Sequence, residues 1–197
     1  MTSISAVKAI RIINQSRLQF VTPTAISQLF DLTKKNTVYK LLQRLEKYQL
    51  IHRLNHGQYL VTNSSVTDFT IANFLITPSY ISFESALSFY GILAQFPYPI
   101  TSATTKKSVV IDALNKEFQF TRLSGKFFFG YQSINRQLIA CPEKALIDSL
   151  YLMSKKLRWL NLDELDLTPI NKNRLKQLAL KISFRPFIKL FLKLKLW

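Results

Sequence analysis

Cationic and hydrogen-bonding side chains gather along one side of the segment Lys34–Tyr48, and their types suit contact with nucleic acid. Stepped at about 100° per residue, the apolar residues fall within one narrow sector: Val38, Leu41, Leu42 and Leu45. The opposite side and the start of the segment carry the candidate contacts Lys34, Lys35, Asn36, Thr37, Lys40, Arg44 and Lys47. Arginine bonds guanine bidentately, asparagine bonds adenine, and lysine mostly meets phosphates. We therefore expect a helix with a DNA-contacting face, against the alternative of a merely solvated face.

The elements around this helix are typical of a winged helix-turn-helix. Apolar spacing predicts a helix over Ser5–Ser16, and Thr22 followed by Pro23 predicts the start of a second helix. Two short β-type runs, Ile51–Leu54 and Gln58–Val61, flank a turn that contains Gly57 and predict a hairpin. Three helices followed by a hairpin place the third helix in the major groove of DNA and the hairpin along its backbone or minor groove.

Arg53, His56 and Gln58 are the candidate DNA contacts of the hairpin. His52 and His56 lie on different sides of its turn without a nearby third ligand, so we expect no metal site.

Composition narrows the function class. The 197 residues include 27 lysines and arginines against 11 acidic residues, for a formal net charge of +16. This excess favours polyanionic partners. The single cysteine, Cys141, excludes an internal disulfide framework, and its context predicts a buried structural thiol. Charges at Lys8 and Arg11 argue against a signal peptide, and no apolar run is long enough to span a membrane. A cytoplasmic location is therefore expected.

The polar run from Thr62 to Thr67 predicts a domain edge, which divides the chain into a DNA-binding domain over 1–66 and a second domain over 67–197. Ser82 and Gly91 bracket a predicted short helix, and another is predicted from Cys141 to Ser154. Four β-branched or aromatic runs predict a small sheet: Pro99–Thr104, Val109–Ile111, Phe118–Thr121 and Phe127–Tyr131. The expected fold class is α+β, with a mixed α/β second domain and C-terminal helices.

No catalytic or cofactor motif stands out, so we expect neither enzymatic activity nor a cofactor. The run Phe187–Trp197 alternates apolar residues with lysines. It predicts either a packing helix with outward lysine heads, which we favour, or a segment that lies on a membrane.

Four segments of the second half, in this order, resemble the AbiEi-type antitoxins of bacterial abortive-infection (type IV toxin–antitoxin) systems. They are Tyr80–Leu87, Ile100–Lys107, Phe128–Tyr131 and Cys141–Asp148. The predicted winged helix also lies where that family has it.

The resemblance implies a transcriptional repressor that binds double-stranded DNA at inverted repeats in its own promoter. It also implies an antitoxin that counteracts a nucleotidyltransferase-like toxin, without necessarily forming a stable complex. It supplies no catalytic residues. The alternative is an RNA- or toxin-binding interaction module without sequence-specific DNA binding.

Overall fold

The protein is a mixed α+β protein with two sheets, as the computed structural model of residues 4–194 shows. The chain divides into two compact units, and the main boundary between them falls between Thr67 and Asp68. The boundary predicted from the sequence falls between Val66 and Thr67.

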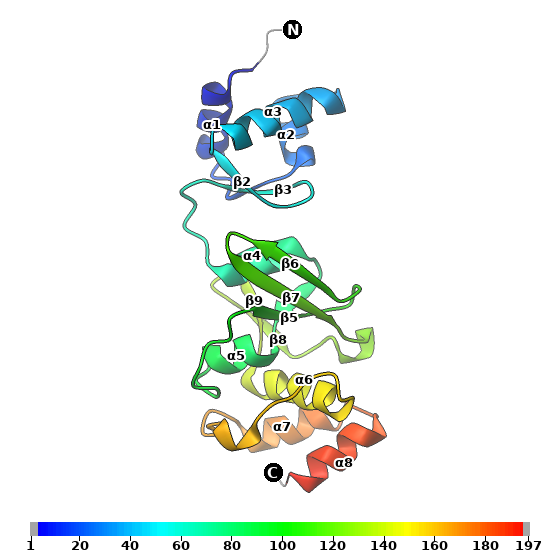
Figure 1. The fold of residues 1–197 in the computed structure, drawn as a ribbon. Coiled ribbons are helices and arrows are strands. Elements are labelled where there is room, and N and C mark those ends of the chain that lie inside the picture. Colours follow the sequence, from blue (N-terminus) through cyan, green and yellow to red (C-terminus); the bar gives the residue numbers. More distant parts are fainter. Residues whose placement is uncertain (1–3, 195–197) are drawn as a thin grey trace. The chain divides into compact units, whose positions relative to one another are not determined.

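Three helices and a three-stranded antiparallel sheet form the first unit (Figure 1). The sheet has the order β1-β3-β2. In chain order the elements are α1 (Ala6–Gln15), β1 (Phe20–Val21), α2 (Pro23–Leu29), α3 (Lys35–Lys47), β2 (Ile51–Asn55) and β3 (Gln58–Val61). The three predicted helices and the hairpin are confirmed, whereas β1 was not predicted.

Local chemistry explains where these elements begin and turn. The Thr22 hydroxyl accepts a hydrogen bond from the Ala25 N–H at 3.2 Å, and Pro23 occupies the first helical position of α2. Gly57 has φ +68° in the β2–β3 turn, a conformation that side chains with a Cβ rarely adopt. The inward faces of α1, α2 and α3 then close over the sheet in one apolar core.

The second unit is built on a six-stranded sheet of order β6-β7-β5-β4-β9-β8. The pairs β4–β9 and β5–β7 are parallel, while β4–β5 and β8–β9 are antiparallel. Its strands are β4 (Ser79–Ile81), β5 (Ile100–Thr104), β6 (Val109–Ala113), β7 (Lys116–Arg122), β8 (Tyr131–Ile134) and β9 (Gln137–Ala140). Its α-helices are α4 (Asp68–Leu75), α5 (Phe83–Phe89), α6 (Pro142–Ser154), α7 (Lys172–Ala179) and α8 (Arg185–Lys193).

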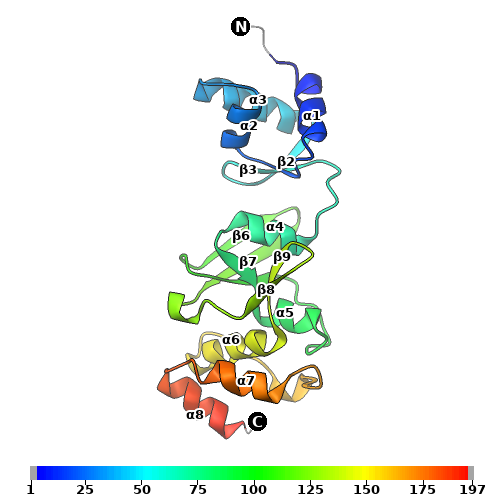
Figure 2. The ribbon, with the colours of Figure 1, turned by 180° about the vertical axis from the view of Figure 1, so that it is seen from behind.

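The helices of this unit cover both faces of its sheet. In Figures 1 and 2, α4 lies on one side of the sheet and α5 and α6 lie on the other. All five residues of β5 are buried, as a strand covered on both faces requires. Helices α7 and α8 pack on α6 and form the outermost layer of the unit.

One local prediction for this unit was wrong. Phe127–Tyr131 is not a strand: a 3₁₀ turn, η1 (Gly125–Phe127), precedes an irregular stretch, and β8 begins only at Tyr131. The predicted helix between Ser82 and Gly91 is confirmed as α5. Ser82 occupies its N-cap position, although the Ser82 side chain makes no capping hydrogen bond. Its hydroxyl donates instead to Asp148, 2.8 Å away. Elements α4, β4 and β9 were not predicted.

The basic C-terminal segment forms α8, whose Phe187 and Phe191 are buried. The favoured prediction of a packing helix is therefore confirmed up to Leu194, whereas Lys195, Leu196 and Trp197 lie outside the described residues. None of the helices between residues 4 and 194 is long and apolar enough to cross a bilayer.

Candidate nucleic-acid interface

Helix α3 turns its polar side away from the core of the first unit. Its four leucine and valine side chains are at most 3% exposed, because they pack against α1, α2 and β2. The predicted contacts Lys34, Lys35, Asn36, Thr37, Lys40 and Lys47 are all exposed, while Arg44 is half-buried. The structure therefore brings the seven predicted residues of this segment to the accessible surface of one helix and its N-cap.

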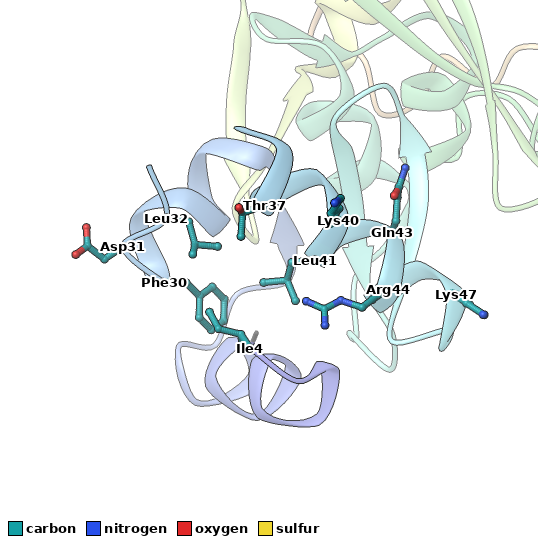
Figure 3. Close-up of a pocket in the computed structure, with 10 residues that line it drawn as sticks. All are labelled: Ile4, Phe30, Asp31, Leu32, Thr37, Lys40, Leu41, Gln43, Arg44 and Lys47. Carbon is teal, nitrogen blue, oxygen red and sulfur yellow. The ribbon is translucent and has the colours of Figure 1, made fainter. Parts of the chain in front are cut away.

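A groove of about 830 Å³ runs along one flank of this helix (Figure 3). One wall is mostly apolar and comprises Ile4, Phe30 and Leu32, with the exposed Asp31 between the last two and Leu41 of α3 beside them. The other wall is the polar side of α3: Thr37, Lys40, Gln43, Arg44 and Lys47. In Figure 3 the Arg44 guanidinium extends toward Ile4 and Phe30, whereas Lys47 points away. The groove can thus offer charge, hydrogen-bond donors and apolar contact side by side.

The charges of α3 are arranged unevenly with respect to its helix dipole. Arg44 and Lys47 lie in the last turn, where a cation is stabilised by the partial negative charge of that end. Lys34 and Lys35 stand at the N-terminal end, where cations are disfavoured, and Lys34 provides no side-chain cap. A bound anion at this end would offset that unfavourable placement.

The hairpin residues lie on a separate element of the same unit. Arg53 and His56 are exposed, whereas Gln58 is half-buried. Arg53 pairs in register with Tyr59, whose pKa is raised by burial while the guanidinium opposes that shift. The N–H of His56 donates to Asn55 Oδ1 at 2.8 Å, which orders the turn that presents the imidazole.

Two kinds of groove residue were not predicted from the sequence. Gln43 is exposed on α3 between the two predicted lysines Lys40 and Lys47, and its helical spacing could have revealed it. Ile4 and Phe30 come from other segments, so no local pattern points to them.

A second cluster of polar side chains lies inside the second unit. Asp148 forms an ion pair with Lys144 one helical turn away, and it accepts hydrogen bonds from the Tyr80 and Ser82 hydroxyls at 2.9 and 2.8 Å. The four residues are at most 1% exposed. Burial raises the pKa of Asp148, and its hydrogen bonds and Lys144 oppose the shift. A group closed off from solvent in this way belongs to the core and offers no access to a substrate.

Two further candidates for chemistry are the thiol of Cys141 and a cluster of metal-binding side chains. Cys141 is 1% exposed, as predicted for a structural thiol, and burial raises its pKa. Across residues 4–194, no three His, Cys, Asp or Glu side chains gather as a metal ion would require.

The fold and surface define a two-unit α+β protein with a cationic helix face in its first unit. No model of a known protein family matches the sequence, and no characterised protein matches it. Among solved structures, the fold is similar to that of the RV2827C protein from Mycobacterium tuberculosis, with a TM-score of 0.56. The similarity covers 94% of this chain and 70% of that chain at 13% sequence identity, which shows a related fold alone.

Proposed function

We propose that the first unit is a winged helix-turn-helix that reads double-stranded DNA with α3. The observation that carries this proposal is the segregation of α3: its leucines and valine are buried, while its cations and amides face outward beside a groove. A preceding helix, α2, and a following hairpin with exposed Arg53 and His56 complete the arrangement that major-groove recognition uses.

The roles of the side chains follow from their chemistry. Lys40 and Lys47 are exposed point charges that neutralise phosphates, which positions the protein without reading bases. Arg44 and Asn36 can bond guanine and adenine edges, respectively. The apolar wall near Arg44 suits a thymine methyl group.

The biological role proposed for this DNA binding is that of a type IV antitoxin. The chain would repress its own operon at upstream inverted repeats and counteract a nucleotidyltransferase-like toxin encoded beside it. What supports this part is the resemblance of Tyr80–Leu87, Ile100–Lys107, Phe128–Tyr131 and Cys141–Asp148 to AbiEi-type antitoxins.

The DNA-binding proposal is tested by fluorescence anisotropy with the DNA upstream of the protein's own reading frame, against a scrambled duplex. Lys35, Lys40, Lys47 and Arg53 are exposed. If each neutralises one phosphate, log K falls against log salt with a slope of roughly −3.6 per chain. We expect a preference for the upstream DNA of about a hundredfold or more, on the order of 3 kcal/mol.

Three variants separate the proposed roles. Lys40→Ala should weaken binding to both duplexes alike and reduce the magnitude of the salt slope by about 0.9. Arg44→Ala should cost about 1–3 kcal/mol on the upstream DNA alone, because it removes a base contact. Lys8→Ala, on an exposed position of α1, is the matched control and should change neither. Equal binding to both duplexes would reject sequence reading and favour an RNA- or toxin-binding module.

The antitoxin role is tested separately by co-expression with the product of the neighbouring gene. Rescue of growth from that product supports the role, and failure of the folded protein to rescue growth rejects it. The Lys40→Ala variant then reports whether rescue depends on DNA binding.

A further inference from the structure

The outer layer of the second unit is strongly cationic. From Leu167 to Leu194 the chain has seven lysines and arginines and no acidic residue, and all seven cations are exposed. Three of them, Arg185, Lys189 and Lys193, follow the outward side of α8, opposite the buried Phe187 and Phe191. Such a surface attracts anions and disfavours a second copy of itself.

Large apolar side chains are exposed on both flanks of this cationic helix. On one flank, Leu180, Ile188 and Leu192 border a small groove between α7 and α8, and they are 77, 40 and 53% exposed. On the other flank, Leu157 and Trp159 border a groove with Pro186 and Leu190 of α8. Leu157 is 70% exposed and Trp159 is 80% exposed. A surface that contacts only water seldom exposes a cluster of leucine and tryptophan side chains around lysines. Such a cluster is typical of an interaction site.

We propose that the α7–α8 face attaches the protein peripherally to anionic lipid surfaces. Arg185, Lys189 and Lys193 contact the phosphates of the headgroups, while Trp159, Leu180 and Leu192 enter the boundary between headgroups and acyl chains. This division of labour is the one by which interfacial segments bind, and tryptophan favours that boundary because its ring is apolar and its N–H is polar.

The composition of the face distinguishes lipid from other anionic partners. Protein–nucleic-acid interfaces are more polar than this face, which exposes five large apolar side chains: Leu157, Trp159, Leu180, Ile188 and Leu192. Protein–protein interfaces are depleted in lysine, whereas five of the seven cations here are lysines. Lysine stems that lie along an apolar surface with their ammonium groups outward are favourable at a membrane.

The first test is flotation of the 197-residue chain with vesicles made of equal parts of phosphatidylglycerol and phosphatidylcholine, or of phosphatidylcholine alone. Each cation near an anionic surface strengthens binding about fivefold. Three such contacts predict that binding to the anionic vesicles exceeds binding to the neutral ones on the order of a hundredfold.

Matched variants assign the binding to this face. The triple change Arg185→Gln, Lys189→Gln, Lys193→Gln should reduce vesicle affinity on the order of a hundredfold. Leu180→Ser and Leu192→Ser should each reduce it about tenfold, since each removes apolar surface from the lipid. The controls are Lys106→Gln with Lys107→Gln, which removes exposed cations elsewhere in the unit, and Val7→Ser, at a 76% exposed valine of α1. Neither control should change vesicle binding.

Fluorescence tests insertion directly. The chain has two tryptophans, and Trp197→Phe leaves Trp159 as the single reporter. Its emission should shift to shorter wavelength with the anionic vesicles and stay unchanged with the neutral ones.

Several results would overturn the proposal: no flotation, equal flotation with both vesicles, insensitivity to the α8 triple variant, or no shift of the Trp159 emission. Loss of duplex DNA affinity in the triple variant, without vesicle binding by the wild type, would assign the face to nucleic acid instead. The DNA-binding proposal is tested independently, because Lys40→Ala lies in the first unit and should leave vesicle binding intact.

Discussion

Replacing only one partner of the buried ion pair between Lys144 and Asp148 should strongly destabilise the second unit. Asp148→Asn keeps the shape of the side chain but leaves the Lys144 ammonium without its anion. Both side chains are at most 2% exposed, so the stranded charge has no access to water. Removal of one partner from a buried ion pair typically costs about 3–5 kcal/mol. We expect the free energy of unfolding to fall by roughly 4 kcal/mol in this variant.

The double change Lys144→Met with Asp148→Asn should cost far less. It leaves no buried charge, and the amide oxygen at position 148 can still accept a hydrogen bond from the Tyr80 or Ser82 hydroxyl. We expect the double variant to lose only about 1 kcal/mol, because uncharged replacements of buried ion pairs are often near neutral. The two single changes should therefore be non-additive by at least about 3 kcal/mol.

The assay uses Cys141, which is the single cysteine and is buried in the second unit. Pulsed alkylation across a urea series measures the opening of this unit within the 197-residue chain. Lys116→Gln is the control, since its ion pair with Asp68 joins side chains that are 44 and 40% exposed. It should change the free energy of unfolding by about 0–1 kcal/mol. Additivity of the two core changes within about 0.5 kcal/mol would refute the pairing argument.

Three further predictions concern single positions, each checked by urea unfolding. Gly130→Ala should lower the free energy of unfolding of the second unit by on the order of 2 kcal/mol. Gly130 has φ +74°, and a Cβ there would meet the Lys144 side chain at 3.1 Å. An unchanged urea midpoint would contradict this prediction. Burial and the neighbouring Asp148 carboxylate hold the pKa of Tyr80 well above the ordinary tyrosine value of about 10. The native state therefore resists an ionisation that the unfolded chain accepts. Stability is then lost as pH rises above about 10, and wild type should lose about 1.4 kcal/mol per pH unit relative to Tyr80→Phe; parallel pH profiles would disprove it. Thr22→Ala should destabilise the first unit by about 1 kcal/mol through loss of the α2 cap, whereas Thr22→Ser should retain stability.

The first unit was largely predictable because its signals are local. The alternation of apolar and polar residues in α3, the cap at Thr22 and the turn at Gly57 each act within a few residues of the chain. The exposed face of α3 follows from the same helical spacing. Strand β1 was not predicted because it has only two residues, Phe20 and Val21, which are too few to show an alternating pattern. Its position depends on β3, about forty residues further along the chain.

The structure of the second unit was harder to predict where it depends on contacts between segments that are far apart in the sequence. Helix α4 combines buried positions around much of its circumference, so its sequence DFTIANFL lacks a clear polar face. The aromatic run Phe127–Tyr131 has high strand propensity, but tertiary packing overrides it. Phe128 packs on Tyr80 with ring centroids 4.9 Å apart, and the ring of Phe129 faces the Lys144 ammonium at 4.8 Å.

The buried ion pair of Lys144 and Asp148 shows most clearly why burial cannot be predicted from local sequence patterns alone. Lysine and aspartate four residues apart are typical of a solvated helix surface, so their spacing alone indicates exposure. Their burial follows from Tyr80 and Ser82, which precede Asp148 by more than sixty residues and supply the two hydroxyls that bind its carboxylate. The segment Cys141–Asp148 thus supplies the two charged groups at the polar centre of the core. Its residues are explained by folding before any contact with a partner is invoked, and tests of the antitoxin role need variants on exposed positions of this unit.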